Sequence, residues 1–360
     1  AVILILCAGL LLSPMGSAII TIAPSPYKAM SQILQFPNTT VVESTTGIRG
    51  RNERVKTPHI RFAPGISLKY TQALPQQHAI FRDGDNQFVL YNLSSPRDAR
   101  FAMYTVSFSG YHLISNPKDV LVIENNGGLA IACAVASGAP NVKIAVNNPH
   151  IARAVQHHYH LPVINRNPRA YLAQTDEKFQ VIQVEDWGTS IPGSDALDQH
   201  HLLSIDAFSQ YIKHLTPDGI VVVSRRLLLP PANTVRLWAT AYESLKKAGI
   251  RDPRAHIAML RNWDTFTLIV SAAPLDDPEK IIQFARDRNF DVVFLPEVNR
   301  DDVNRFNIYD APFHFNEIDQ LAKAYSLGKQ KTYLNQYLLD VVPQSDNRPF
   351  PGRFLKWHKL

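Results

Sequence analysis

Five short apolar runs, rich in valine and isoleucine, alternate with helix-like stretches over residues 119–271. They read DVLVI, VKIAV, FQVIQV, GIVVVS and TFTLIVS, and begin at Asp119, Val142, Phe179, Gly219 and Thr265. Continuous apolar runs of this length are typical of strands that are buried on both faces. Strands that alternate with helices along a chain predict a parallel sheet covered by helices on both sides. We therefore predict an α/β domain with a mostly parallel sheet over residues 96–360.

Three stretches near these runs carry helix signals. IDAFSQYIKHL begins at Ile205 and is followed by a TPDG turn, NTVRLWATAYESLKKAG ends at Gly249, and PEKIIQFARDRN begins at Pro278. Glycine just after a helix and proline in its first turn are the usual boundary residues. From Asp301 onward we expect helical surface segments that end in an irregular stretch.

The preceding residues, 24–95, show a different rhythm of short β runs broken by turns. These runs are TTVVEST, HIRFAP, SLKYTQ and HAIFRDGDNQFVLYN. The last contains Asp83-Gly84 between alternating hydrophobic residues, which is a strong hairpin signal. We predict a small β subdomain here.

The first 23 residues are apolar and carry no charge. About 20 apolar residues are needed to span a bilayer as a helix. A secretory signal would begin with basic residues, but none precedes Lys28. We expect a transmembrane helix over residues 1–23 that is cut from a longer protein, since the chain starts with Ala1. The alternative is a buried helix interrupted at Pro14.

Charge and cysteine content point away from several protein classes. The net charge is +6, but the basic residues are scattered and no nucleic-acid-binding motif accompanies them, so we expect no nucleic-acid partner. Neither Cys7 nor Cys133 has metal-ligand spacing around it. The paired histidines do not follow the i, i+4 spacing of helical zinc sites, so we expect no metal. The pairs are His157-His158 and His200-His201, and His160 stands two positions after the first pair.

Ligands of an open parallel sheet bind beyond the carboxyl ends of its strands, where the first strand turns into its helix. In this chain that turn reads ENNGG. Gly127 and Gly128 allow close backbone approach, and asparagine tolerates left-handed geometry. Glu124 adds bulk and negative charge at the same place. A ligand cradle formed with Asn126 and a purely structural turn both remain open.

A second candidate site follows the strand FQVIQV, which ends in Glu185-Asp186. A carboxylate at this edge can act as a general base if burial raises its pKa. The alternative is a helix cap or a surface acid. Arg225-Arg226, after GIVVVS, could meet an anion or could be a solvated loop pair.

Several motifs together resemble a known family. In chain order they are DVLVIENNGGLAIACAVASGA, VKIAVNNPHI, NRNPRAYLA, FQVIQVEDWGTSIPG, HLTPDGIVVVS and PQSDNRPFP. They resemble the polyamine aminopropyltransferases, or spermidine synthases, and most of all bacterial membrane-bound spermidine synthase-like proteins. The likeness covers about residues 25–357.

The resemblance implies a class I methyltransferase-like (Rossmann-like) sheet that binds decarboxylated S-adenosylmethionine or S-adenosylmethionine. It also implies a small-molecule amine as the second substrate, a homodimer as a possible assembly, and a role in polyamine biosynthesis. Adenosyl-ligand chemistry implies that the soluble domain faces the cytoplasm, with the membrane reached through the N-terminal segment.

Carried over position by position, the resemblance places Glu185 where the family has its catalytic aspartate, with Asp186 beside it. Glu124 and Asn126 stand where the family's turn has glycines, before Gly127 and Gly128. Four acids of the family are replaced by neutral residues, namely Ala130, Val146, Asn167 and Gly188.

A cationic sulfonium and a cationic amine need negative charge around them. Each lost charged hydrogen bond should cost about 1.5 to 3 kcal/mol of binding free energy. We therefore predict a degenerate ligand site on a transferase fold. Three functions remain: an active transferase using Glu185 and Asp186; an inactive scaffold or sensor domain of a membrane protein; and a domain that binds an anionic ligand through Arg166, Arg169 and Arg225.

Overall fold

The computed structural model describes residues 9, 24–47, 50–95, 97–188, 195–298 and 300–356. Apart from Gly9, the predicted membrane helix over residues 1–23 lies outside this part. Within the described residues, no helix is both long and apolar enough to cross a membrane.

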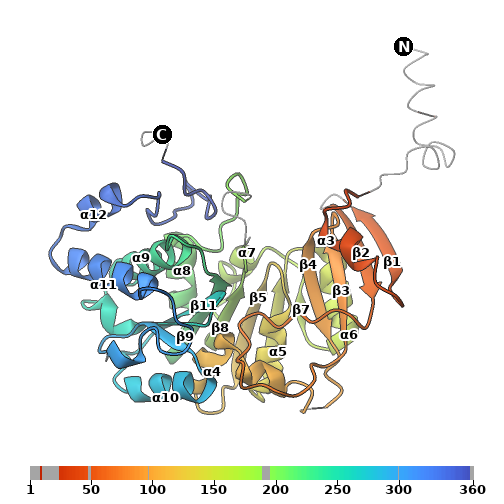
Figure 1. Cartoon of the computed structure of the whole chain (residues 1–360), viewed down its shortest axis with the longest axis horizontal. Helices are drawn as coiled ribbons and strands as arrows, with labels where there is room; N and C mark the ends of the chain where they lie inside the picture. Colours follow the sequence, from red (N-terminus) through yellow and green to blue (C-terminus); the bar gives the residue numbers. More distant parts are fainter. Residues whose placement is uncertain are drawn as a thin grey trace.

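Two sheets organise the chain (Figure 1). The smaller is antiparallel, with strand order β1-β2-β3-β4. Its strands are β1 (Thr40–Gly47), β2 (Gly50–Lys56), β3 (Gln77–Arg82) and β4 (Asn86–Tyr91), and the short helix α3 (Ala29–Ile33) precedes them. The predicted hairpin is confirmed between β3 and β4. Its turn holds Asp83 and Gly84 at positive φ, 55° and 78°, which glycine adopts freely and aspartate tolerates.

The larger sheet has eight strands in the order β12-β10-β11-β9-β8-β5-β6-β7. They are β5 (Asp119–Glu124), β6 (Asn141–Val146), β7 (Val163–Ile164), β8 (Phe179–Glu185), β9 (Leu215–Arg226), β10 (Ile257–Arg261), β11 (Thr265–Ser271) and β12 (Asp291–Phe294). The five strands from β7 to β9 run parallel. The order reverses at β5, which places a topological switch point at its carboxyl end. The predicted class I methyltransferase-like fold is confirmed.

The runs HIRFAP and SLKYTQ, expected as β runs, form no strand. The larger sheet is mostly parallel, as predicted, but it is not parallel throughout. TFTLIVS forms β11, but β11 pairs antiparallel with β9 and with β10, and β10 pairs antiparallel with β12. A tight turn causes the reversal, because the Asn262 side chain accepts the N–H groups of Asp264 and Thr265 at 3.1 and 2.8 Å. The TPDG stretch lies within β9 instead of forming a separate turn.

The three predicted helices are confirmed as α8, α9 and α10, and Gly249 adopts a φ of 87° just after α9. The helices after α3 are α4 (Ser109–Leu113), α5 (Leu129–Ala136), α6 (Pro149–Tyr159), α7 (Pro168–Leu172), α8 (Ile205–Lys213), α9 (Asn233–Lys247), α10 (Pro278–Arg288), α11 (Phe313–Ser326) and α12 (Gln330–Gln336). Short 3₁₀ turns are η1 (Arg100–Tyr104), η2 (Val106–Phe108), η3 (Pro253–His256) and η4 (Arg300–Asp302).

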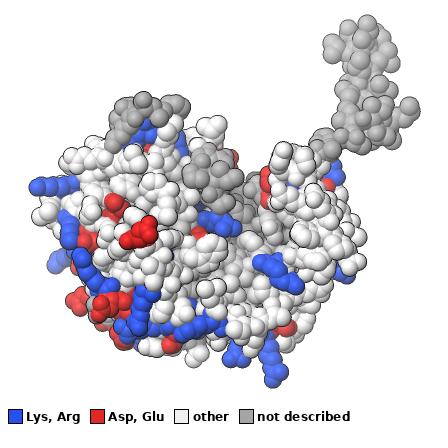
Figure 2. Space-filling model, viewed as in Figure 1, with Lys and Arg blue, Asp and Glu red and all other residues white. Residues whose placement is uncertain are grey.

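Helices cover both faces of the larger sheet. In β5, Val120 and Val122 pack with residues of α5, α6 and α10. Leu121 and Ile123 point the other way and pack with residues of α8, α9 and α11. Because successive strand residues alternate between faces, one apolar run supplies both cores. Figure 2 shows that Lys and Arg are dispersed over the visible face and mixed with acids along its lower left side.

The smaller sheet docks against the switch point through β4. The N–H of Val89 donates to the carbonyl of Gly127 at 2.8 Å, and the N–H of Gly127 donates to the carbonyl of Gln87 at 3.2 Å. On the α6 side, the N–H of Tyr91 donates to the Tyr159 hydroxyl at 2.8 Å. The turn at which a ligand was expected is therefore covered by the chain itself.

Candidate functional site

Two glutamates end neighbouring parallel strands at the switch point. Glu124 closes β5, Glu185 closes β8, and the strand register pairs them directly. Both side chains are buried, with exposed fractions of 4% and 1%. A carboxyl pair that is buried away from bulk solvent is costly to ionise fully. The site is thus built around a buried acid pair.

The Glu185 carboxylate binds the N-terminus of α5. Its Oε1 accepts the N–H of Leu129 at 3.1 Å, and its Oε2 accepts the N–H of Ala130 at 2.5 Å. The indole N–H of Trp187 also donates to Oε1. Backbone N–H groups at a helix start lack partners within the helix and carry positive partial charge. The N-terminus of α5 is an anion-binding site, and the carboxylate of Glu185 from the same chain occupies it.

Both carboxyl groups have raised pKa values. For Glu124, burial raises the pKa well above its ordinary value, and the neighbouring Glu185 raises it further. For Glu185, burial raises the pKa, while the Ala130 N–H, Glu124 and Trp187 oppose the rise. Among the described residues no donor meets the Glu124 oxygens in good hydrogen-bond geometry, although the N–H groups of Gly128 and Ile131 lie close enough to affect its pKa. Both shifts favour a proton that the pair retains.

The two glycines of the turn are in close contact with their surroundings. Gly127 has a φ of 112° and Gly128 a φ of 88°. A Cβ on Gly127 would collide with the Glu185 carboxylate and the Trp187 indole, and a Cβ on Gly128 would collide with the Val89 carbonyl. The glycines thus permit the close approach that the sequence predicted, but the approaching groups belong to this chain.

Asp186, the second predicted catalytic residue, is paired with an arginine and a histidine. It is buried, and its Oδ2 lies 2.8 Å from Nη1 of Arg225 and 2.9 Å from Nε2 of His200. Burial alone would raise the pKa of Asp186, but the Arg225 charge and the contact with His200 outweigh it and hold the pKa far below the ordinary value. Arg225 is buried in this pair, so a solvated loop pair is the wrong description. Asp186 is positioned as an ion-pair partner, with its charge already matched.

The other predicted ligand residues have separate locations. The Asn126 side chain accepts the N–H of Trp187 at 3.0 Å, and it therefore holds the two loops together. Val146 is buried at the end of β6 beside Glu124. Asn167 is exposed and caps α7 by accepting the N–H groups of Arg169 and Ala170 at 2.9 and 3.3 Å. The structure brings Glu124, Asn126 and Val146 to one edge, whereas Asn167 is a helix cap outside the cavity there.

That cavity has a volume of about 60 Å³. It is lined by Arg82, Phe88, Glu124, Asn125, Val146, Asn147, Asn148 and Ile151. Pockets that enclose small organic ligands usually measure about 300 to 1,000 Å³. As the described residues line it, this cavity therefore does not fit an S-adenosylmethionine-type group. The acids at this edge are also poorly suited to match a sulfonium charge, because the pKa of Glu124 is raised and Asp186 is already paired with Arg225.

The three arginines proposed for an anionic ligand are engaged elsewhere. Arg169 forms a two-pronged ion pair with Asp346 at 2.6 and 2.7 Å, and Arg166 donates to Gln174 at 2.7 Å. Arg225 holds Asp186. In the described part of the chain, no group of three or more His, Cys, Asp and Glu side chains is arranged to hold a metal ion.

Sequence reasoning missed Trp187 and His200 as parts of the site. Trp187 stands two residues after Glu185 in the sequence, and a buried indole needs a hydrogen-bond acceptor, so its contact with the carboxylate could have been considered. His200 carried no comparable signal, because its partner Asp186 stands 14 positions earlier in the sequence, with no local pattern that links the two.

Comparison with known proteins gives fold-level similarity only. No protein-family model and no curated protein matches the chain. A spermidine synthase in complex with the transition-state analogue AdoDATO is 14% identical, with 80% of this chain and 87% of that chain covered and a TM-score of 0.44. A spermidine synthase from Thermotoga maritima is also 14% identical, with coverage of 80% and 88% and a TM-score of 0.44. A probable spermidine synthase from Corynebacterium glutamicum is 9% identical, with coverage of 68% and 87% and a TM-score of 0.43.

Proposed function

We propose that this chain has the fold of an S-adenosylmethionine-dependent transferase but that its ligand edge has become a packing contact. The domain then works as a non-catalytic scaffold or sensor, and the N-terminal segment attaches it to a membrane. The residues at this edge stabilise the protein itself instead of binding a substrate.

The observation that carries this proposal is the set of contacts made by Glu185. Its two oxygens accept three N–H groups, from Leu129, Ala130 and Trp187. A catalytic base must reach a proton on its substrate, but this carboxylate faces α5 and is covered by Trp187. The docking of β4 on Gly127 closes the same edge from the other side.

Isothermal titration calorimetry of the chain with S-adenosylmethionine and with decarboxylated S-adenosylmethionine tests the proposal. We expect no saturable heat up to about 1 mM ligand, because the described residues of the edge enclose only a small cavity and Asp186 is already paired. Saturable binding with a dissociation constant below about 0.1 mM would contradict it.

A second candidate, an aminopropyltransferase-like enzyme with an altered site, is favoured by one observation. The raised pKa of Glu185 is a common property of general bases. The two candidates are separated by incubating the chain with labelled decarboxylated S-adenosylmethionine and a diamine. Our proposal predicts no labelled polyamine, and a labelled product would establish the enzyme.

A further inference from the structure

A second cavity lies between the smaller sheet and α6, away from the edge described above. It measures about 260 Å³. Its walls are formed by Glu43, Thr45, Asn52, Arg54, Ile80, His150, Arg153, Ala154 and His157. None of these residues lines the small cavity beside Glu124. Asn148 lines that small cavity, and its hydrogen bond to Asn52 at 3.0 Å joins the walls of the two.

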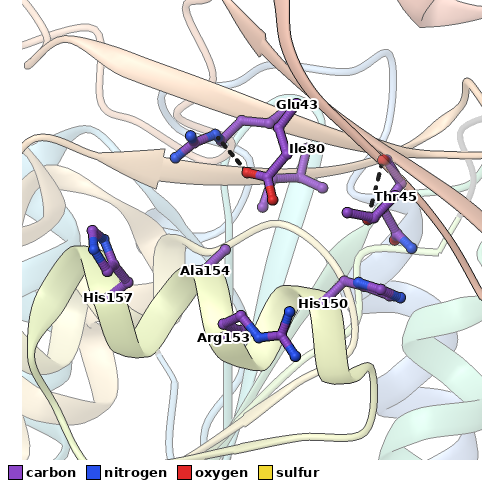
Figure 3. Close-up of a pocket in the computed structure, with 9 residues that line it drawn as sticks. Glu43, Thr45, Ile80, His150, Arg153, Ala154 and His157 are labelled. Atoms are coloured by element: carbon purple, nitrogen blue, oxygen red, sulfur yellow. Dashed lines mark hydrogen bonds and ion pairs between the residues drawn. The ribbon is translucent and has the colours of Figure 1, made fainter.

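The α6 wall carries three cationic or donor side chains on one face. His150, Arg153 and His157 follow the i, i+3, i+7 spacing that aligns side chains along a helix. Figure 3 shows all three on the helix, with Glu43 and Ile80 across the gap from them. Within the described residues Arg153 makes no hydrogen bond or ion pair, so its charge is unmatched.

The sheet wall adds one more guanidinium and the cavity's one carboxylate. Arg54 lies 3.3 Å from Glu43 through its Nε, but no described group accepts a hydrogen bond from that buried Nε. The lining thus holds two guanidinium groups, two imidazoles and one carboxylate. Arginine matches phosphate oxygens with paired N–H donors, and imidazole N–H groups can add to them.

We infer that this cavity, hereafter the α6 cleft, binds a compact phosphate-bearing anion. Its volume is just below the usual range of about 300 to 1,000 Å³ for small-molecule pockets, which favours a pyrophosphate or a small phosphate ester over a whole nucleotide. Arg153 and Arg54 supply charge from opposite walls. The Asn148 side chain already accepts the N–H groups of His150 and Ile151 at the start of α6, so the inference rests on the two guanidinium groups and not on the helix N-terminus. The inference does not depend on the proposed function, since no residue of the switch-point edge lines the cleft.

Calorimetric titration of the chain with inorganic pyrophosphate tests the inference. We expect saturable binding below about 1 mM. Arg153→Ala should weaken binding about 10-fold or more, because a charged hydrogen-bond partner is lost. Glu43→Gln should tighten binding, because it removes the negative charge that competes for Arg54. Arg251→Ala, which removes an exposed arginine outside the cleft, is the matched control and should leave binding unchanged.

Absence of pyrophosphate binding by the wild-type chain would overturn the inference. An equal loss in Arg153→Ala and Arg251→Ala would also overturn it, since that pattern indicates non-specific attraction. A lipid headgroup is distinguished by sedimentation with phosphatidylglycerol vesicles, and binding to vesicles without binding to pyrophosphate would reject a soluble anion. Because S-adenosylmethionine binding is measured separately, failure here leaves the proposed function standing.

Discussion

At the scale of single residues, the location of a side chain in the fold was easier to predict than its hydrogen-bond and ion-pair partners. The end of the apolar run FQVIQV placed Glu185 at the ligand edge, because strand ends of a parallel sheet share one edge. Its partners Leu129 and Ala130 stand more than 50 positions earlier in the sequence, at separations of 56 and 55 residues. Asp186 and Arg225 are 39 positions apart. Such pairings depend on the three-dimensional path of the chain, and a single sequence does not encode them in any local pattern.

The proton held by the glutamate pair gives stability a defined pH dependence. A raised carboxyl pKa means that the folded state binds more protons than the unfolded state between the ordinary value of 4.5 and the raised value. Stability from this source is therefore complete below pH 4.5 and is lost as pH rises through the folded pKa. Asp186, with its lowered pKa, has the opposite sign and acts only at more acidic pH.

We predict that Glu124→Gln flattens this dependence, because a neutral amide replaces one of the two carboxyl groups that retain the proton. Urea unfolding at pH 5 and at pH 8 provides the measurement. The variant should gain in unfolding free energy relative to wild type as pH rises between these values. If the difference in unfolding free energy between the variant and wild type is the same at pH 5 and at pH 8, the pair does not share a proton.

At the scale of elements, the apolar runs, the helix boundaries and the parallel pairs were predictable, whereas the antiparallel strands of the larger sheet were not. The runs for β5, β6, β8 and β9 were long, apolar and separated by helices, which is sufficient to predict parallel pairing. The strands β10 and β12 have only 5 and 4 residues, and they join the sheet through antiparallel pairs. A short buried strand leaves too few residues for periodicity to reveal it.

The contact between β4 and the glycine turn yields a prediction with an internal control. Gly128→Ala places a Cβ against the Val89 carbonyl and also incurs the cost of a positive φ. Gly138→Ala tests the effect of a positive φ alone. Gly138 has a φ of 74°, and no atom lies within 4 Å of the added Cβ.

We expect Gly138→Ala to cost about 1 to 2 kcal/mol of unfolding free energy, which is the usual cost of a left-handed residue. Gly128→Ala should cost at least about 3 kcal/mol, because the backbone of β4 must move as well. Denaturant unfolding curves provide both values. Equal costs for the two variants would mean that β4 does not press against the turn in solution.

At the scale of the whole molecule, the sequence predicted an irregular C-terminal stretch but not the way it is held. Arg236 of α9 is buried, and its guanidinium donates to the carbonyl groups of Asp340, Phe350, Pro351 and Arg353. Carbonyl acceptors carry no side-chain signature, so this attachment was invisible in the sequence. One planar group thus fixes a segment more than 100 residues away in the chain.

Replacement of Arg236 should loosen that segment. We predict that Arg236→Ala costs about 3 to 5 kcal/mol, because buried acceptors lose their partner. Arg236→Lys should recover little of it, since an ammonium group cannot reproduce a planar set of donors. Limited proteolysis should cleave the tail of Arg236→Ala first. Wild-type resistance in that variant would refute the role of Arg236 as an anchor.

The account as a whole depends on Glu185 serving the fold instead of a reaction. Replacing a catalytic group commonly leaves a protein as stable or makes it more stable, whereas removing a buried hydrogen-bonded group destabilises it. The direct measurement is the unfolding free energy of Glu185→Gln, with Asp176→Asn as an exposed control. We predict a loss of about 2 to 4 kcal/mol for Glu185→Gln, because the N–H of Ala130 would face an amide NH₂ group. Unchanged or increased stability would contradict the account and return Glu185 to the role of a catalytic base.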